Sequence, residues 1–376
     1  MSANMSFFLI VALCFTTLVC AMPLSSTNAT NTTTSNTWSA SQFANLITFG
    51  DSYSDENRLN YFYAHNDNPP PSGTMLPENL NAFDGGRVWA RYVIQYTDIQ
   101  DSNGTYPSMT LYDYAVAGGT CSNNITPHYA APGVLFPSVT EYGIPTFISD
   151  SQINTYGTGA EFFSPPLSAD NAVYAIWIGT NDLGNGEFLT GQQVAGKTLQ
   201  DFVNCVFNAF DSLYNNGGRY FVLLNIVPLN LAPQYATAEL GGVTADHYWP
   251  DKPSDLDAIS ATMENQVTTV NADYWNQLPG MVGSRYPGAN FAILNVNQLL
   301  LDIYNNPQYY LNGSAPGNVT GYQKHCAVDD SSCYVLDSPD SFIWYDELHP
   351  SEQFERLVAR EFVNTLNGDS QYAAYY

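Results

Sequence analysis

Three short apolar runs in this chain end directly in motifs of small and polar residues. These are residues 47–49 before Gly50-Asp51-Ser52, residues 111–117 before Gly118-Gly119, and residues 175–178 before Gly179-Thr180-Asn181-Asp182. Nearly continuous apolar runs of this length are typical of strands that are buried on both faces. If these strands are parallel, their motifs meet at one edge of a sheet, where open α/β sheets bind their ligands.

The remaining pattern alternates strands with helices. The predicted strands are Leu46–Phe49, Leu111–Tyr114, Val173–Ile178, Tyr220–Ile226 and Phe291–Val296. Apolar stripes at helical spacing predict helices over residues 202–214, over Ser254–Leu278, and after Pro350 and Ser351. Alternation of this kind implies right-handed crossovers between parallel strands. We therefore predict a three-layer α/β/α sandwich around a five-stranded parallel sheet.

The chain is divided by composition into one large domain with short flanking segments. Residues 1–21 have the apolar core and small-residue cleavage site of a secretory signal. Residues 22–40 are rich in Ser, Thr and Asn and predict a flexible leader. Residues 41–367 form the predicted folded domain that carries the motifs, and residues 368–376 are predicted to be a loose tail. No later run is apolar enough to span a membrane, so we expect a secreted, soluble, extracellular protein.

The charge of the chain limits its partners. There are 35 acidic residues against 10 basic ones, a formal net charge of −25. A chain this acidic is repelled by nucleic acids and by anionic membrane surfaces. We expect no nucleic-acid partner; a monomer is favoured, although the sequence leaves the oligomeric state open.

Four cysteines remain once the signal segment, with Cys14 and Cys20, is removed. An even number of cysteines in an oxidising compartment predicts disulfides. Three pairings are possible; the short loop between Cys326 and Cys333 favours that bond, which leaves Cys121 with Cys205. Because the cysteines lack Cys-x-x-Cys spacing, no metal site is predicted.

Six sequons for N-linked glycosylation support a secreted glycoprotein. Their asparagines are Asn28, Asn31, Asn103, Asn124, Asn312 and Asn318.

The motifs together contain the parts of an acyl-transfer site. Ser52 follows the first strand, and a helix that started there would direct its backbone N–H groups toward the serine. Asn181 can donate an amide to a developing negative charge, and Gly118 lets a backbone N–H approach a ligand. Asp346 lies three residues before His349, a spacing that lets the carboxylate accept from the imidazole. Each motif alone is more often a helix cap or a turn, but their combination favours catalysis.

These four motifs resemble those of the GDSL, or SGNH, hydrolases. The family has Gly-Asp-Ser near its start, then a glycine, a Gly-x-Asn-Asp and a late Asp-x-x-His, and all four occur here. The fourth residue of the first motif is Tyr53, where the family name has Leu. The longer strings at residues 49–56, 86–89, 117–123 and 348–353 are similar to secreted fungal acetylesterases of carbohydrate esterase family sixteen.

The resemblance implies specific roles for these residues. Ser52 would be the nucleophile, His349 the general base and then acid, and Asp346 the group that orients the histidine. The oxyanion hole would consist of the Ser52 and Gly118 backbone N–H groups and the Asn181 side chain, with no metal or cofactor. The implied activity is removal of acetyl groups from carbohydrates such as hemicellulose-derived oligosaccharides, and the implied partner is a small-molecule or oligosaccharide ester substrate.

Two other functions stay open on sequence grounds. A lipase, phospholipase or acyltransferase acting on longer acyl chains could use the same motifs. A non-catalytic carbohydrate-binding protein is disfavoured because the four key side chains are intact. A glycosidase would need two carboxylates at a defined separation, and nothing singles out such a pair. Trp89 and Trp177 lie near the motifs; burial is favoured for Trp177, which lies in a predicted strand.

Overall fold

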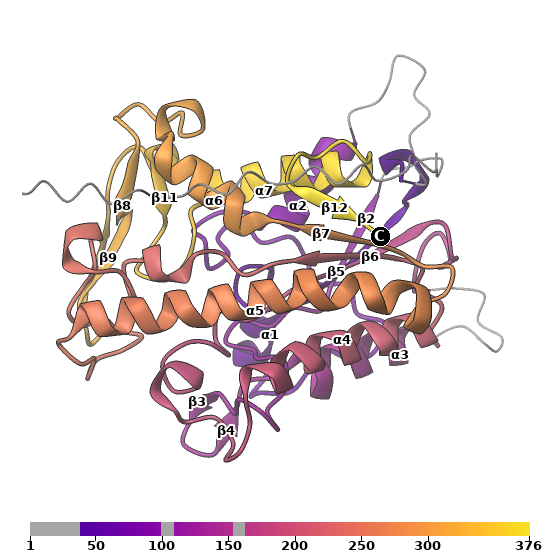
Figure 1. The fold of residues 1–376 in the computed structure, drawn as a ribbon, viewed down its shortest axis with the longest axis horizontal. Helices are drawn as coiled ribbons and strands as arrows, with labels where there is room; N and C mark the ends of the chain where they lie inside the picture. The colour runs from indigo at the N-terminus through magenta and orange to yellow at the C-terminus, as the bar shows by residue number, and fades with distance from the viewer. Residues whose placement is uncertain (1–37, 99–108, 153–161) are drawn as a thin grey trace, which may run out of the picture. The chain divides into compact units, whose positions relative to one another are not determined.

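A computed structural model describes residues 38–98, 109–152 and 162–376. Its centre is a six-stranded sheet in the order β12-β7-β6-β5-β1-β2 (Figure 1). The strands are β1 (Asn45–Gly50), β2 (Thr110–Asp113), β5 (Ala172–Trp177), β6 (Tyr220–Leu224), β7 (Asn290–Leu294) and β12 (Ala373–Tyr375). The first five are mutually parallel, and they match the five predicted strands to within two residues at either end. The predicted α/β fold is confirmed.

Strand β12 replaces the loose tail that the sequence predicts for residues 368–376. It pairs antiparallel with the edge of β7, and Tyr376 and Phe291 exchange both backbone hydrogen bonds. Tyr372 is buried and donates its hydroxyl to Asp302 at 2.8 Å. The free backbone groups of the edge strand and the burial of an aromatic ring hold this short segment in place.

The folded domain begins before residue 41, where the predicted leader ends. Trp38 is buried, with its ring centroid 5.2 Å from that of Tyr220 and 5.9 Å from that of Tyr375. A large aromatic side chain in an otherwise polar segment therefore belongs to the core. The predicted signal and residues 22–37 lie outside the described residues.

Helices cover both faces of the sheet. On one side lie α3 (Ile144–Ser151), α4 (Leu199–Asn215) and α5 (Leu256–Arg285), and on the other α2 (Trp89–Thr97), α6 (Val296–Asn305) and α7 (Glu352–Leu366) (Figure 1). Helix α4 buries the predicted apolar stripe and begins with a capping box between Thr198 and Asp201. The Ser351 hydroxyl caps α7, as its sequence position predicts.

Helix α5 extends beyond the predicted end at Leu278. It contains Pro279 and continues to Arg285, whose guanidinium forms an ion pair with Asp211 of α4. The following residue, Tyr286, is fully buried and donates to the Phe207 carbonyl. Tertiary contacts with α4 therefore stabilise the helix beyond Pro279, although proline disfavours helix interiors.

Short strands and one helix lie in the connections. They are α1 (Arg58–Ala64), β3 (Tyr129–Ala131), β4 (Val134–Leu135), β8 (Asn318–Tyr322), β9 (Lys324–Cys326), β10 (Cys333–Val335) and β11 (Phe342–Trp344). Disulfides join Cys121 to Cys205 and Cys326 to Cys333. In the described part of the chain, no helix combines the length and the apolar character needed to cross a bilayer.

Buried carboxyl groups hold the loops at the carboxyl ends of the strands. Asp55 accepts from the backbone N–H groups of Leu59 and Ala117, at 2.9 and 2.8 Å. Asp182 accepts from the Cys121 N–H at 3.1 Å and from the Thr126 hydroxyl. Burial raises the pKa of Asp182 to about 7, although these hydrogen bonds oppose the shift.

We expect the protein to lose stability as the pH rises from 5 to 8. Burial raises the pKa of Asp51 to about 6 and those of Asp84 and Asp182 to about 7. The native state therefore keeps protons that the unfolded chain releases near pH 4, and this stabilisation disappears as the pH passes 6 to 7. Thermal unfolding should show a midpoint several degrees higher at pH 5 than at pH 8.

The Asp182→Asn variant is the matched control, because an amide has no proton to lose in this range. Its unfolding midpoint should depend less on pH than that of the wild type. A wild-type midpoint that is constant or rises from pH 5 to 8 would contradict the expectation.

Candidate active site

The three strand-end motifs lie together at the carboxyl edge of the sheet. Ser52 follows β1, Gly118 follows β2, and Asn181 follows β5, and β1 lies between the other two strands. The reversal of strand order around β1 is where open α/β sheets place ligand sites. Gly50 pairs with Trp177, and a Cβ on Gly50 would lie 2.2 Å from the Trp177 carbonyl oxygen. Glycine is therefore required where β1 passes β5.

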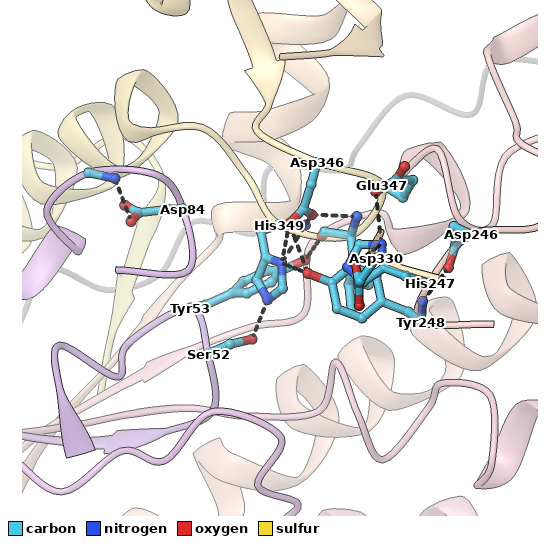
Figure 2. A network of polar contacts seen from close by, with 12 residues as sticks. Ser52, Tyr53, Asp84, Asp246, His247, Tyr248, Asp330, Asp346, Glu347 and His349 are labelled. Atoms are coloured by element: carbon cyan, nitrogen blue, oxygen red, sulfur yellow. Dashed lines mark hydrogen bonds and ion pairs between the residues drawn. The ribbon is translucent and has the colours of Figure 1, made fainter. Parts of the chain in front are cut away.

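Ser52, His349 and Asp346 form a continuous relay of side chains (Figure 2). The Ser52 Oγ lies 2.8 Å from His349 Nε2, and His349 Nδ1 lies 3.0 Å from each Asp346 oxygen. All three residues are at least 96% buried. The structure thus brings together residues that are 297 positions apart in the sequence.

The turn that carries the Asp346 and His349 side chains is fixed by backbone contacts. Asp346 Oδ1 accepts from the N–H groups of Leu348 and His349, at 2.9 and 2.7 Å. The Leu348 carbonyl in turn accepts from the Tyr53 hydroxyl at 2.8 Å. Tyr53 follows Ser52 directly, so one hydrogen bond couples the serine turn to the histidine turn. The hydrogen bonds from the Leu348 and His349 N–H groups to Asp346 thus explain why a three-residue spacing places the carboxylate beside the imidazole.

The electrostatics of the relay favour a carboxylate beside a basic imidazole. Burial lowers the pKa of His349, but the charge of Asp346 and the hydrogen bond to it outweigh burial and raise the pKa above its usual value. Burial raises the pKa of Asp346, but His349 and the two backbone N–H groups outweigh it and leave that pKa lowered. Asp346 therefore stays ionised, and His349 has the basicity of a proton acceptor.

Tyr248 is a member of the site that the sequence does not reveal. Its hydroxyl lies 2.9 Å from Asp346 Oδ2 and 3.2 Å from His349 Nδ1 (Figure 2). Burial and the charge of Asp346 raise the pKa of Tyr248, so its hydroxyl stays protonated and donates to the carboxylate. Tyr248 lies in the irregular segment before α5, where no motif or periodicity distinguishes it.

The segment that carries Tyr248 is attached to the histidine turn. His247 Nδ1 lies 3.8 Å from Glu347 Oε2, and Asp246 Oδ1 accepts from the Tyr248 and Trp249 N–H groups at 2.8 Å each (Figure 2). The Glu347 carbonyl also accepts from the Gln234 N–H at 2.7 Å. These contacts hold the Tyr248 hydroxyl against Asp346.

Two groups expected to donate to an oxyanion lie in loops beside Ser52. Asn181 Nδ2 donates one hydrogen to the Gly119 carbonyl at 2.8 Å, which orients the amide and leaves its second hydrogen available. Gly118 has a φ of +76°, and a Cβ there would lie 2.7 Å from the Phe136 ring. Both the backbone conformation and the space therefore require glycine.

The helix expected to start at Ser52 does not form there. Ser54 and Asp55 donate to the Asp51 carbonyl in a single turn, and α1 begins only at Arg58. The reason is that the Asp55 carboxylate caps α1 through Arg58 and Leu59, which sets the start of that helix. A long helix dipole therefore does not point at the serine.

A polar pocket of about 230 Å³ opens beside the relay. Three aromatic rings line it, those of Phe83, Tyr248 and Tyr345. The lining also contains the amides of Asn60 and Asn81, the ammonium of Lys324, and Ala82, Gly85 and Asp346. Aromatic faces next to hydrogen-bonding amides suit a ligand with both apolar and hydroxyl-bearing faces. The pocket adjoins Asp346 and Tyr248, so a bound ligand lies close to the relay.

The other predicted residues have these positions. Trp177 is buried as favoured, and Trp89 is buried with its indole N–H on the Ser54 hydroxyl at 3.0 Å. Asn124 and Asn312 are exposed, and Asn318 is half-buried; Asn28, Asn31 and Asn103 lie outside the described residues. Among the described residues, one cluster has metal-ligand spacing, Cys326, Asp330 and Cys333, but its two sulfurs are bonded to each other.

The comparisons with known proteins agree with these motifs. The model for GDSL-like lipases and acylhydrolases matches residues 46–362. An acetylesterase of Hypocrea jecorina is 38% identical over 339 residues, covering 89% of this chain and 92% of the relative. An acetylesterase of Thermothelomyces thermophilus is 25% identical over 86% of this chain and 88% of its own.

Among solved structures, an acetylxylan esterase from Geobacillus stearothermophilus is similar over 86% of this chain and 94% of its own, with 12% identity and a TM-score of 0.38. The match of the family model across most of the domain, together with the fungal relative, assigns the family. The chain belongs to the GDSL-like lipases and acylhydrolases and is a carboxylic ester hydrolase.

Proposed function

We propose that this protein is a secreted serine esterase that removes acetyl groups from carbohydrates. The observation that carries the proposal is the relay from the Ser52 hydroxyl through His349 to Asp346. Ser52 is the nucleophile, His349 is the general base and then the acid, and Asp346 orients the imidazole. The contacts support these roles, because His349 Nε2 faces the Ser52 hydroxyl while its Nδ1 faces Asp346.

In the first step the Ser52 oxygen attacks the ester carbonyl carbon, and its proton moves to His349 Nε2. The charge of Asp346 stabilises the imidazolium that forms. The oxyanion of the tetrahedral intermediate accepts from the Ser52 and Gly118 N–H groups and from the free hydrogen of Asn181. The bond from carbon to the sugar oxygen then breaks, and His349 returns its proton to that oxygen.

In the second step water releases the acetyl group from the serine. His349 Nε2 takes a proton from the water as its oxygen attacks the acyl carbon. Collapse of the second tetrahedral intermediate breaks the bond to Ser52 Oγ, and His349 protonates that oxygen. Acetate leaves and the hydroxyl is regenerated, so no group beyond this chain and water is needed.

The acetyl and carbohydrate parts of the proposal rest on the relatives and the pocket. Both fungal relatives are named acetylesterases. The pocket beside the relay offers amides and aromatic faces, which suit a sugar better than a long acyl chain. Two disulfides and six sequons support secretion, since disulfides persist in oxidising compartments.

The substrate assignment is tested by product release. The protein should liberate acetate from acetylated xylo-oligosaccharides and hydrolyse short p-nitrophenyl esters much faster than long ones. The Ser52→Ala variant should lose this activity and its covalent labelling by an organophosphonate. Faster hydrolysis of a long-chain triglyceride would favour the lipase alternative, and labelling of the alanine variant would identify another nucleophile.

The Asn181→Ala variant tests the oxyanion site. Loss of one such donor typically lowers kcat by about 10²–10³, and we expect a loss in this range with KM changed much less. Because Asn181 also holds the Gly119 carbonyl, circular dichroism and thermal unfolding should accompany the kinetics. A folded variant with near wild-type turnover would remove Asn181 from the mechanism.

The Tyr248→Phe variant tests the hydroxyl that donates to Asp346. Without this donor the carboxylate interacts more strongly with the imidazolium, so the acidic limb of the kcat/KM profile should move to higher pH. The Asp346 carboxylate also becomes less fixed, and we expect kcat to fall roughly tenfold, ~1.4 kcal/mol in the barrier.

The exposed Tyr309→Phe change is the matched control and should leave the profile unchanged. A Tyr248→Phe profile that overlays that of the wild type would show that the hydroxyl has no part in positioning the relay.

A further inference from the structure

The pocket beside the relay contains one cation, Lys324, which the proposed acyl transfer does not use. Lys324 begins β9, and its backbone N–H donates to the Tyr345 carbonyl at 2.6 Å, one residue before Asp346. Its ammonium lies 5.6 Å from the centroid of the Tyr345 ring, and both side chains line the pocket. The cation is thus placed next to the catalytic turn.

The surrounding structure holds Lys324 in this position. Strand β9 pairs with β10, where Val335 is opposite Lys324, and the disulfide from Cys326 to Cys333 links the same two strands. The Tyr345 ring packs directly on Gly85, where a Cβ would lie 2.2 Å from the ring. The disulfide-linked β9–β10 hairpin and the packed Tyr345 ring therefore fix the pocket wall that carries the ammonium. A fixed wall limits the conformational entropy lost when a ligand pairs with Lys324.

Lys324 differs from most other cations of this acidic chain. Six described basic side chains form ion pairs with carboxylates; they are Arg87, Arg91, Lys197, Arg285, Arg356 and Arg360. Lys252 instead donates to two carbonyls, and Arg58 and Arg219 donate to backbone carbonyls. Within the described ranges, Lys324 has no ion pair with a carboxylate.

Among the described residues that line this pocket, Asp346 is the one carboxylate, and it has no ion pair with Lys324. Asp346 already interacts with His349, with the Tyr248 hydroxyl and with two backbone N–H groups. These hydrogen bonds hold the Asp346 carboxylate within the relay, and the N–H donors of the Lys324 ammonium are left for a ligand. In a chain with net charge −25, a cation directed into a pocket favours anions locally against the field of the whole protein.

We propose that this pocket binds a carboxylate-bearing sugar of the substrate, with Lys324 pairing to the carboxylate. The inference rests on the proposed carbohydrate esterase function and defines the substrate class further. Asn60 and Asn81 supply amides for sugar hydroxyls, and Phe83 and Tyr345 supply faces for the apolar side of the ring. A lone ammonium suits a monovalent carboxylate, whereas a phosphate group is usually held by several donors.

Two acetylated oligosaccharides of equal length test this inference, one neutral and one carrying a uronic acid beside the acetylated sugar. We expect the wild type to hydrolyse the acidic substrate with about fivefold higher kcat/KM at low salt. Added salt should reduce this preference, because a partly exposed ion pair is screened. The difference should lie mainly in KM, since the carboxylate is remote from the reacting carbonyl.

The Lys324→Gln variant should lose most of the preference, because its kcat/KM should fall more for the acidic substrate than for the neutral one. Lys324→Arg should retain the preference in part, because the charge is kept. Lys197→Gln, which removes a lysine of the α4 N-terminus paired with Asp201, is the matched control and should leave the preference unchanged.

An equal loss on both substrates in Lys324→Gln, or a wild-type preference for the neutral one, would overturn the role of Lys324 alone. The proposed esterase function would then still stand on the hydrolysis of the neutral substrate. Release of acetate from neither substrate would instead overturn the proposed carbohydrate function, and this inference with it.

Discussion

The parallel pairing of β1 with β5 is the constraint on which the site depends. Six residue pairs in register, from Asn45 opposite Ala172 to Gly50 opposite Trp177, make the two strands end at the same level. Ser52 then follows just after β1, and Asn181 just after β5, at the same edge of the sheet. Because the order of strands reverses at β1, the Gly118 loop approaches from the other side. A shift of one residue would turn the motifs away from one another.

The loops above this edge are held by buried polar groups as well as by apolar packing. Asp55 joins the serine turn to Ala117, and Asp182 joins the Asn181 turn to Cys121. Asn181 adds a third contact, to the Gly119 carbonyl. Each is a hydrogen bond in which a side chain satisfies a buried backbone group that would otherwise be costly. The Gly118 loop is therefore positioned from both neighbouring motifs, which is the preorganisation that an oxyanion site requires.

Sequence reasoning predicted what depends on local pattern. The five parallel strands are continuous apolar runs, and their ends locate Ser52, Gly118 and Asn181. The spacing of Asp346 and His349 predicted that the carboxylate accepts from the imidazole, and in the structure the same carboxylate also accepts from N–H groups two and three residues ahead.

The rest is set by tertiary contacts. Tyr248 reaches Asp346 from an irregular segment 98 residues away, and Lys324 reaches the pocket from a hairpin. Likewise, Trp38 packs on Tyr220, and β12 pairs with the free edge of β7. Neither partner can be identified from the local sequence pattern.

The buried carboxyl groups link the pH dependence of stability to that of the proposed catalysis. In the proposed mechanism catalysis needs neutral His349, whose pKa is raised by Asp346, so turnover is favoured as the pH rises. The fold instead favours neutral Asp51, Asp84 and Asp182, whose pKa values near 6 to 7 make it most stable at lower pH. Asp51 and Asp84 also raise the pKa of His349 through their charges. As these two groups become neutral in mildly acid solution, they stop stabilising the imidazolium, and the histidine keeps more of its neutral form. The same protonation that stabilises the fold therefore extends the range over which His349 can act as a base toward acid pH.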